Sequence, residues 1–194
     1  MPSDIFQRLK SKAAEEGIRV GTPSARRWFR KRITGMESIS RASLMKDEVR
    51  ASTRLTPGKL YFFSYDPKLK KVLPYYDRFP LCIPIDVGSD NFLGLNLHYL
   101  PPTVRLRFFD KLAEITNNKK FNSTTKMAVT YKMLKGAEKL SAFRPTIKRY
   151  LRTHVRSKFI LIPADEWDIA LLLPMADFKK SSESKIWTNS RKMM

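Results

Sequence analysis

Residues 59–100 read KLYFFSYDPKLKKVLPYYDRFPLCIPIDVGSDNFLGLNLHYL, and this stretch decides the fold class. Aromatic and β-branched residues dominate it, as is typical of strands. Turn-forming residues interrupt it at Asp66-Pro67 and at Gly88-Ser89-Asp90. The pattern predicts short strands over residues 59–66, 70–77, 79–87 and 92–100.

Prolines shape this stretch further. Pro74, Pro80 and Pro84 cannot donate hydrogen bonds to a neighbouring strand, so we expect edges, bends or bulges where they occur. Short, bent strands of this kind favour a small antiparallel sheet or an SH3-like barrel.

Helical patterns precede the strands. Ile5, Leu9 and Ala13 recur on one helical face that ends at Gly17. Thr22-Pro23-Ser24 is typical of a helix start and opens the segment SARRWFRKRI. A third short helix is predicted over residues 40–50, which completes a basic, helical N-terminal arm over residues 1–55.

Helical periodicity returns after residue 101. Val104, Phe108, Leu112 and Ile115 share one face. A second helix is predicted to begin at Asn122-Ser123, with Met127, Tyr131 and Leu134 as its apolar stripe. Pro145 is predicted to open a third helix that runs to residue 158. A strand over 159–163 and a short helix over 164–174 follow.

These elements predict an α+β protein in three parts. The arm covers residues 1–55, a single body covers 56–175, and a basic tail covers 176–194. Within the body, residues 56–100 form the barrel-like sheet and residues 101–175 are mainly helical. We expect the tail to be mobile unless Ile186 and Trp187 pack against the body.

Charge restricts the class of partner. The 194 residues include 38 Lys or Arg and 18 Asp or Glu, for a net charge of +20. Such a positive field attracts nucleic acid or an anionic membrane. The basic residues are spread along the chain, and no apolar run approaches the roughly 20 residues that a membrane span needs. A polyanion such as DNA is therefore the favoured partner.

Cysteine and histidine are scarce. One cysteine and two histidines cannot build a disulfide framework or a zinc site, which indicates a reducing compartment. Cys82 lies in an apolar run, where a small core residue is expected. We therefore predict no metal and no cofactor.

The segment 144–158 is the strongest candidate for a phosphate contact, because it is basic and contains no acid. As a helix it would present Arg149, Arg152 and Arg156 on one face, which suits a row of phosphates. A surface for acidic groups of a protein partner and an ordinary solvated face are the alternatives. The predicted DNA-contacting residues of this segment are Arg144, Lys148, Arg149, Arg152, Arg156 and Lys158.

A second basic cluster lies in the predicted helix after Thr22. Trp28 and Phe29 stand among its cations; they could stack on bases but are expected to anchor the helix to the core. The predicted contacts here are Arg26, Arg27, Arg30, Lys31 and Arg32. Lys68, Lys70 and Lys71 are expected at a hairpin tip, where they keep an edge soluble or contact a DNA backbone.

No catalytic motif is recognisable. The sequence lacks phosphate-binding glycine loops, nucleophile elbows and metal-ligand spacings. His98 on an alternating strand is expected to be a structural hydrogen-bonding residue. The alternative is a basic nuclease that would use His98, Asp77 and Arg78.

Several motifs resemble a family of structural proteins from T-even-like tailed phages, including those of marine cyanobacteria. They are YDPK (65–68), LPYYDRFP (73–80), GLNLHYLPP (94–102) and HVRSKF (154–159), within a resemblance that covers residues 55–174. The members that protect the end of the packaged genome match best.

The resemblance implies a non-enzymatic virion component at the head–tail neck, present in the host cytoplasm during assembly. It implies the phage genome end as DNA partner, together with portal, neck, tail or baseplate proteins. A tail or baseplate protein that binds acidic protein neighbours is the alternative.

Overall fold

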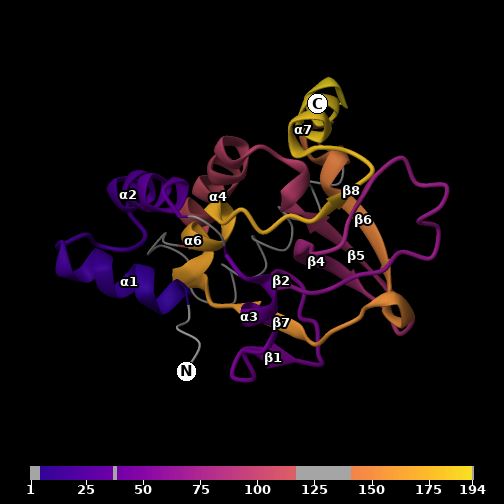
Figure 1. Ribbon diagram of the computed structural model, residues 1–194, viewed down its shortest axis with the longest axis horizontal. Helices are drawn as coiled ribbons and strands as arrows, with labels where there is room; N and C mark the ends of the chain where they lie inside the picture. Colours follow the sequence, from indigo (N-terminus) through magenta and orange to yellow (C-terminus); the bar gives the residue numbers. More distant parts are fainter. Residues whose placement is uncertain (1–4, 37–38, 117–140, 194) are drawn as a thin grey trace.

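The computed structural model describes residues 5–36, 39–116 and 141–193. Its main feature is a six-stranded antiparallel sheet in the order β1-β7-β2-β4-β5-β6, with a separate pair β3-β8 (Figure 1). The strands are β1 (Ala51–Ser52), β2 (Leu60–Phe62), β3 (Tyr76–Asp77), β4 (Leu81–Val87), β5 (Asn91–Asn96), β6 (Ile147–Leu151), β7 (Phe159–Ile162) and β8 (Phe178–Lys179).

The α+β class is confirmed, whereas the closed barrel is not. Strands β1 and β6 stand at opposite ends of the strand order, so the sheet is open. The α-helices are α1 (Ile5–Glu15), α2 (Pro23–Thr34), α3 (Arg41–Met45), α4 (Pro102–Thr116), α6 (Trp167–Leu172) and α7 (Glu183–Met193). The predicted helix with Met127, Tyr131 and Leu134 lies outside the described residues.

Strands β2 and β4 form within predicted strands, and β5 overlaps the strand predicted over residues 92–100. That strand ends at Asn96, and Leu97–Tyr99 form a 3₁₀ turn, so His98 lies in this turn and not on a strand as predicted.

Pro84 lies at an irregularity, because the pairing of β4 with β5 shifts register between Pro84 and Asp86. A Cβ atom on Gly94 would lie 2.3 Å from the Cys82 Sγ atom, so the close approach of these two strands requires glycine.

The strand predicted over residues 70–77 is wrong except at its end, where β3 forms. The backbone between Asp66 and Leu73 turns instead. The Lys70 N–H donates to the Pro67 carbonyl, and the Leu73 N–H donates to the Leu69 carbonyl. This segment projects from the side of the molecule that carries β6 and β8 (Figure 1).

The helix predicted from Pro145 to residue 158 is also wrong. The segment forms β6, followed by one 3₁₀ turn (Arg152–His154). Strand β6 pairs with β5 from Leu151 opposite Asn91 to Ile147 opposite Leu95. Tyr150 thereby stacks on Phe92, with ring centroids 5.1 Å apart, and this tertiary contact overrides the local helical period.

Two apolar cores lie on opposite faces of the sheet. Alternate residues such as Phe62 and Ile83 face a core shared with α1, α2 and α6. Their neighbours face a mainly aromatic core: Tyr61, Phe63, Tyr65, Phe92, Tyr150 and Phe159. Helices α1 and α2 lie side by side next to α6 (Figure 1).

The N-terminal helices and the C-terminal helix α7 both pack onto this framework. Phe6 of α1 and Phe29 of α2 are fully buried in the core that contains the sheet. In α7, Ile186 is fully buried and the Trp187 indole N–H donates to the His98 carbonyl at 2.9 Å. The tail is therefore docked, while the boundaries of the arm, body and tail stay predictions.

Candidate nucleic-acid interface

The basic segment 144–158 follows the free edge of the sheet along β6, the last strand in the order, and then passes beside Ser64 and Tyr65 toward β7. Arg144, Arg149 and Lys158 are the exposed cations of this segment that no side-chain ion pair engages in the described structure. Arg149 Nη1 lies 3.5 Å from the Asn91 side-chain oxygen. We call Arg144, Arg149 and Lys158 the β6 patch.

The three predicted arginines of this segment do not share one helix face. Arg149 projects from β6, whereas Arg152 lies in the following 3₁₀ turn and its Nε donates to the Gly88 carbonyl at 3.0 Å. Arg156 is farther along, where its Nη2 lies 3.8 Å from the Asp66 carboxylate. That these arginines bind phosphates stays a prediction, although the shared helix face on which the prediction was based does not form.

Lys148 is partly buried, unlike the members of the β6 patch. Its ammonium nitrogen lies 4.1 Å from the centre of the Tyr99 ring, a cation–π geometry. Burial lowers the pKa of Lys148 to about 8. In this conformation, Lys148 is engaged within the protein.

The cations of α2 divide into two groups. Arg26 pairs with Asp110 and donates from Nε to Asp168 at 2.8 Å, so it joins α2 to α4 and α6. Arg27, Arg30 and Lys31 are exposed, and we call them the α2 patch.

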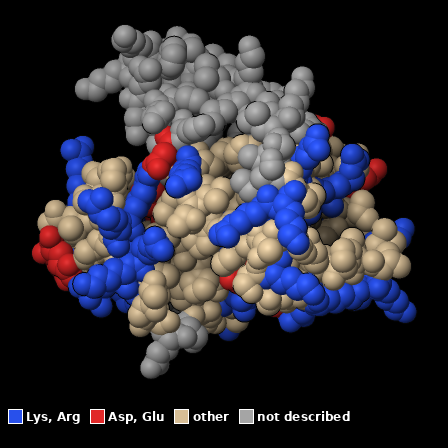
Figure 2. Space-filling model, turned by 90° about the horizontal axis from the view of Figure 1, so that it is seen from above, with Lys and Arg blue, Asp and Glu red and all other residues tan. Residues whose placement is uncertain are grey.

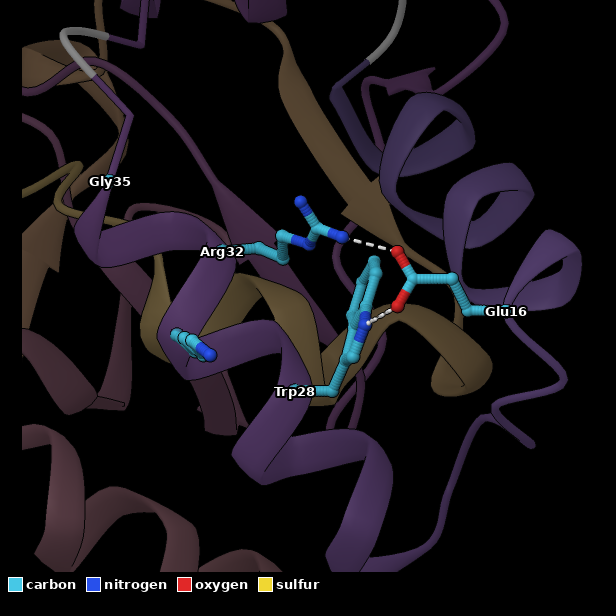
Figure 3. A pocket seen from close by; sticks show the side chains of 5 residues that line it. Glu16, Trp28, Arg32 and Gly35 are labelled. Carbon is cyan, nitrogen blue, oxygen red and sulfur yellow. Dashed lines mark hydrogen bonds and ion pairs between the residues drawn. The ribbon is translucent and has the colours of Figure 1, made fainter.

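Arg32 takes part in a local cluster at the junction of α1 and α2 (Figure 3). It pairs with Glu16, which also accepts a hydrogen bond from the Trp28 indole at 2.6 Å. These bonds lower the pKa of Glu16, the bond from Trp28 contributing most. The cluster lines a shallow pocket of about 420 Å³ with Lys31 and Gly35. Trp28 also packs against the core, as expected.

A further basic cluster forms where β8 passes the 66–73 segment. Lys180 follows β8 and donates to the backbone carbonyls of Lys71 at 2.8 Å and Leu73 at 2.9 Å. The pairing of β8 with β3 brings Lys179 opposite Tyr76. The sequence predicts surface lysines over residues 68–71, but nothing in the local sequence indicates that Lys179 and Lys180 lie beside them.

Positive charge is distributed over a wide area. Figure 2 shows Lys and Arg side chains at both ends of one face, with acidic side chains confined to a few places. One end carries α1 and α2, and the other carries β6, β8 and α7 (Figures 1 and 2). Such a surface favours contact with a phosphate backbone over reading of bases.

His98 and Asp77 form a buried pair. The His98 Nδ1 lies 2.7 Å from Asp77 Oδ2, and both side chains are almost completely inaccessible. Burial lowers the pKa of His98 against the opposing effect of Asp77. Burial alone would raise the pKa of Asp77, but His98 and two backbone N–H donors lower it. The two side chains are thus joined by a hydrogen bond that lies inside the protein.

This arrangement is structural, as predicted for His98. Arg78, the third candidate for a nuclease, is exposed and donates instead to Asp177 at 2.7 Å. His98 and Asp77 are both buried, so neither side chain lies at the surface in this structure. Within residues 5–36, 39–116 and 141–193, no group of His, Cys, Asp or Glu is arranged to hold a metal ion.

The fold and surface define a class of protein: a strongly cationic α+β protein whose polar groups in the core hold structure together. A family model described as Phage T4 terminal DNA protecting protein matches residues 1–192, and the chain belongs to this family. The match confirms the resemblance to T4-like phage DNA end protectors and extends it over the N-terminal helices and the tail. No curated protein and no solved structure matched the chain.

Proposed function

We propose that this chain is a non-enzymatic virion protein that holds and protects the end of the packaged phage genome near the head–tail neck. The supporting observation is the distribution of exposed Lys and Arg over both ends of the surface in a member of a DNA-terminus-protecting family (Figure 2). Contacts to the DNA backbone suit this task because they do not depend on the terminal sequence. Portal and neck proteins would be its neighbours.

Among the helices that the structure describes, none is both long and apolar enough to cross a bilayer.

A comparison of open and closed DNA ends tests the proposal. A linear duplex is compared with the same duplex closed at both ends by hairpin loops, across a series of salt concentrations. We expect tighter binding to the open duplex, protection of that duplex from a double-strand exonuclease, and affinity that falls steeply with salt. Equal affinity for the two DNAs would argue against end recognition.

Two further measurements complete the test. Incubation with DNA and RNA, with and without magnesium, should leave both uncut. A map of the assembled particle should place the chain at the genome end. A location remote from DNA would contradict the proposal and support a tail or baseplate role.

A further inference from the structure

The segment between Asp66 and Leu73, which we call the end loop, is held firmly although it projects from the body. Asp66 fixes its base: the Asp66 N–H donates to the His154 carbonyl at 3.0 Å, and the His154 ring donates back to the Asp66 carbonyl at 2.8 Å. The Lys70 ammonium bonds both Asp66 carboxylate oxygens, at 2.9 and 3.0 Å.

Lys180 fastens the other side of the end loop. Its backbone has φ of 67°, a left-handed conformation that non-glycine residues rarely adopt. In this conformation its ammonium reaches the carbonyls of Lys71 and Leu73. A strained residue used to hold a projecting loop points to a role for the loop conformation itself.

The end loop presents apolar side chains to solvent. Leu69 is 61% exposed and Val72 is 76% exposed. Backbone bonds from the N–H groups of Val72 and Leu73 to the Leu69 carbonyl hold these two positions within one turn. The fold thus places two exposed apolar residues, three positions apart, on one hydrogen-bonded turn among lysines.

Cations surround this apolar tip. Lys68, Lys70 and Lys71 belong to the loop itself, Lys180 is bonded to it, and Arg156 lies near Asp66 at its base. A duplex end is the part of DNA with matching chemistry, since the outer face of its last base pair is unstacked and apolar and phosphates surround it. Leucine and similar side chains contact base faces in other DNA-binding proteins, with cations on the adjacent phosphates.

We propose that the end loop caps the duplex terminus, with Leu69 and Val72 against the face of the last base pair and the loop lysines on the flanking phosphates. This inference rests on the proposed function and adds the element that distinguishes an end from the interior of a duplex. At a terminus no base step has to be opened, whereas insertion within the duplex requires unstacking.

The test compares Leu69→Ser/Val72→Ser with wild type and with Val49→Ser. Val49 is 98% exposed, so Val49→Ser removes a similar apolar side chain at a distant position. Affinities for the open and hairpin-closed duplexes are measured by fluorescence anisotropy. The double variant should lose its preference for open ends by roughly tenfold, the order expected when Leu69 and Val72 together lose about 60 Å² of apolar contact with the base pair. Val49→Ser should retain the preference.

Two further experiments identify the side chains that contact the DNA. Lys68→Gln/Lys71→Gln should weaken binding to both duplexes and retain the preference for open ends. A 2-aminopurine in the last base pair should change its fluorescence on binding of wild type and not of Leu69→Ser/Val72→Ser, whereas an internal 2-aminopurine should not respond. Thermal unfolding of each variant verifies the fold, which these exposed positions should leave intact.

The possible failures are distinguishable. If wild type shows no preference for open ends, the proposed function fails and this inference fails with it. If wild type prefers open ends and Leu69→Ser/Val72→Ser does so equally, the end loop is not the element that recognises the DNA end, and the proposed function stands. Loss of binding to vesicles of 3:1 phosphatidylcholine and phosphatidylserine in the double variant, with end preference retained, would overturn the inference in favour of a membrane contact.

Discussion

Asp77 shows how a single buried residue joins distant parts of the chain. Its carboxylate accepts from His98 and Asn96 on one side, and from the N–H groups of Phe79 and Asp177 on the other. The start of β4, the turn after β5 and the start of the tail therefore meet at one acceptor. These four hydrogen bonds account for the burial of an acid at this position.

Replacing Asp77 should destabilise the protein strongly. Asp77→Ala leaves several buried donors without an acceptor, so the free energy of unfolding should fall by about 3–5 kcal/mol. Urea denaturation at neutral pH measures the change. Asp86→Ala, at an exposed position of β4, is the matched control and should change stability by less than about 0.5 kcal/mol. Similar effects of the two changes would contradict the structural role of Asp77.

Because Lys148 is partly buried, we expect the free energy of unfolding to depend on pH in the alkaline range. Its pKa falls from 10.5 in the unfolded chain to about 8 in the folded protein, because burial disfavours the ammonium form. Between these values the unfolded chain binds a proton that the folded protein lacks, so the free energy of unfolding rises with pH.

Urea denaturation at pH 7.5, 8.5 and 9.5 checks this effect. Wild type should gain about 1–2 kcal/mol from Lys148 across this range, and Lys148→Met should lack that gain. Arg144→Met removes an exposed cation in place of the buried one, and it should retain the wild-type slope. A slope unchanged by Lys148→Met would contradict the burial of this ammonium group.

Among the elements, α7 changes most between sequence and structure. Its sequence is polar and basic, yet Ile186 is fully buried and Trp187 donates to the backbone at His98. The Trp187 ring also lies 5.7 Å from the guanidinium of Arg105, which is buried and donates to the carbonyls of His98, Leu100 and Leu171. The helix thus covers a polar part of the core.

Removing the Ile186 side chain tests this docking. Ile186→Ala should lower the free energy of unfolding by about 2–4 kcal/mol, because it leaves a cavity under α7. Lys185→Ala is exposed on the same helix and should have little effect. Denaturation followed by tryptophan fluorescence reports both stability and the environment of Trp187. A cost for Ile186→Ala no larger than that for Lys185→Ala would mean that α7 is not docked in solution.

Sequence patterns predicted the elements whose signals are local. The helix starts follow from cap residues, since Thr22 accepts from the Ala25 N–H as expected, and the end of α1 follows from Gly17. The segment 145–158 failed because spacing of three and four residues fits a helix equally well, and pairing with β5 is not visible locally.

The candidate site was only partly predictable for the same reason. The sequence shows where each Lys and Arg stands along the chain, but it does not show which of them pair with acids or carbonyls in the folded protein. Arg26 meets Asp168 across 142 residues, and Lys180 meets the Leu73 carbonyl across 107. The buried pair of His98 and Asp77 likewise required the fold to bring two strand ends together.

For the whole molecule, the two basic patches make a quantitative prediction. The α2 patch and the β6 patch are each neutralised by Gln at their three positions, as Arg27→Gln/Arg30→Gln/Lys31→Gln and Arg144→Gln/Arg149→Gln/Lys158→Gln. The slope of log affinity against log salt should become shallower by about 0.9 for each DNA phosphate that the variant no longer neutralises.

A third variant controls for charge alone. Lys12→Gln/Arg19→Gln/Lys46→Gln removes equal charge at exposed positions outside both patches and should change the slope least. Anisotropy titrations from low to physiological salt give the three slopes. Indistinguishable slopes for all three variants would mean that neither patch is a preferred DNA contact.

The strand order has a consequence for how the protein is made. Strand β7 lies between β1 and β2, although about half of the chain separates it from them in sequence. A ribosome must therefore deliver Phe159–Ile162 before the middle of the sheet can close, and contacts so far apart in sequence slow folding. Until β7 is in place, the unpaired edge of β2 and the aromatic residues next to it are exposed and can associate with other chains. During synthesis, the unfinished chain is the form most in need of chaperones.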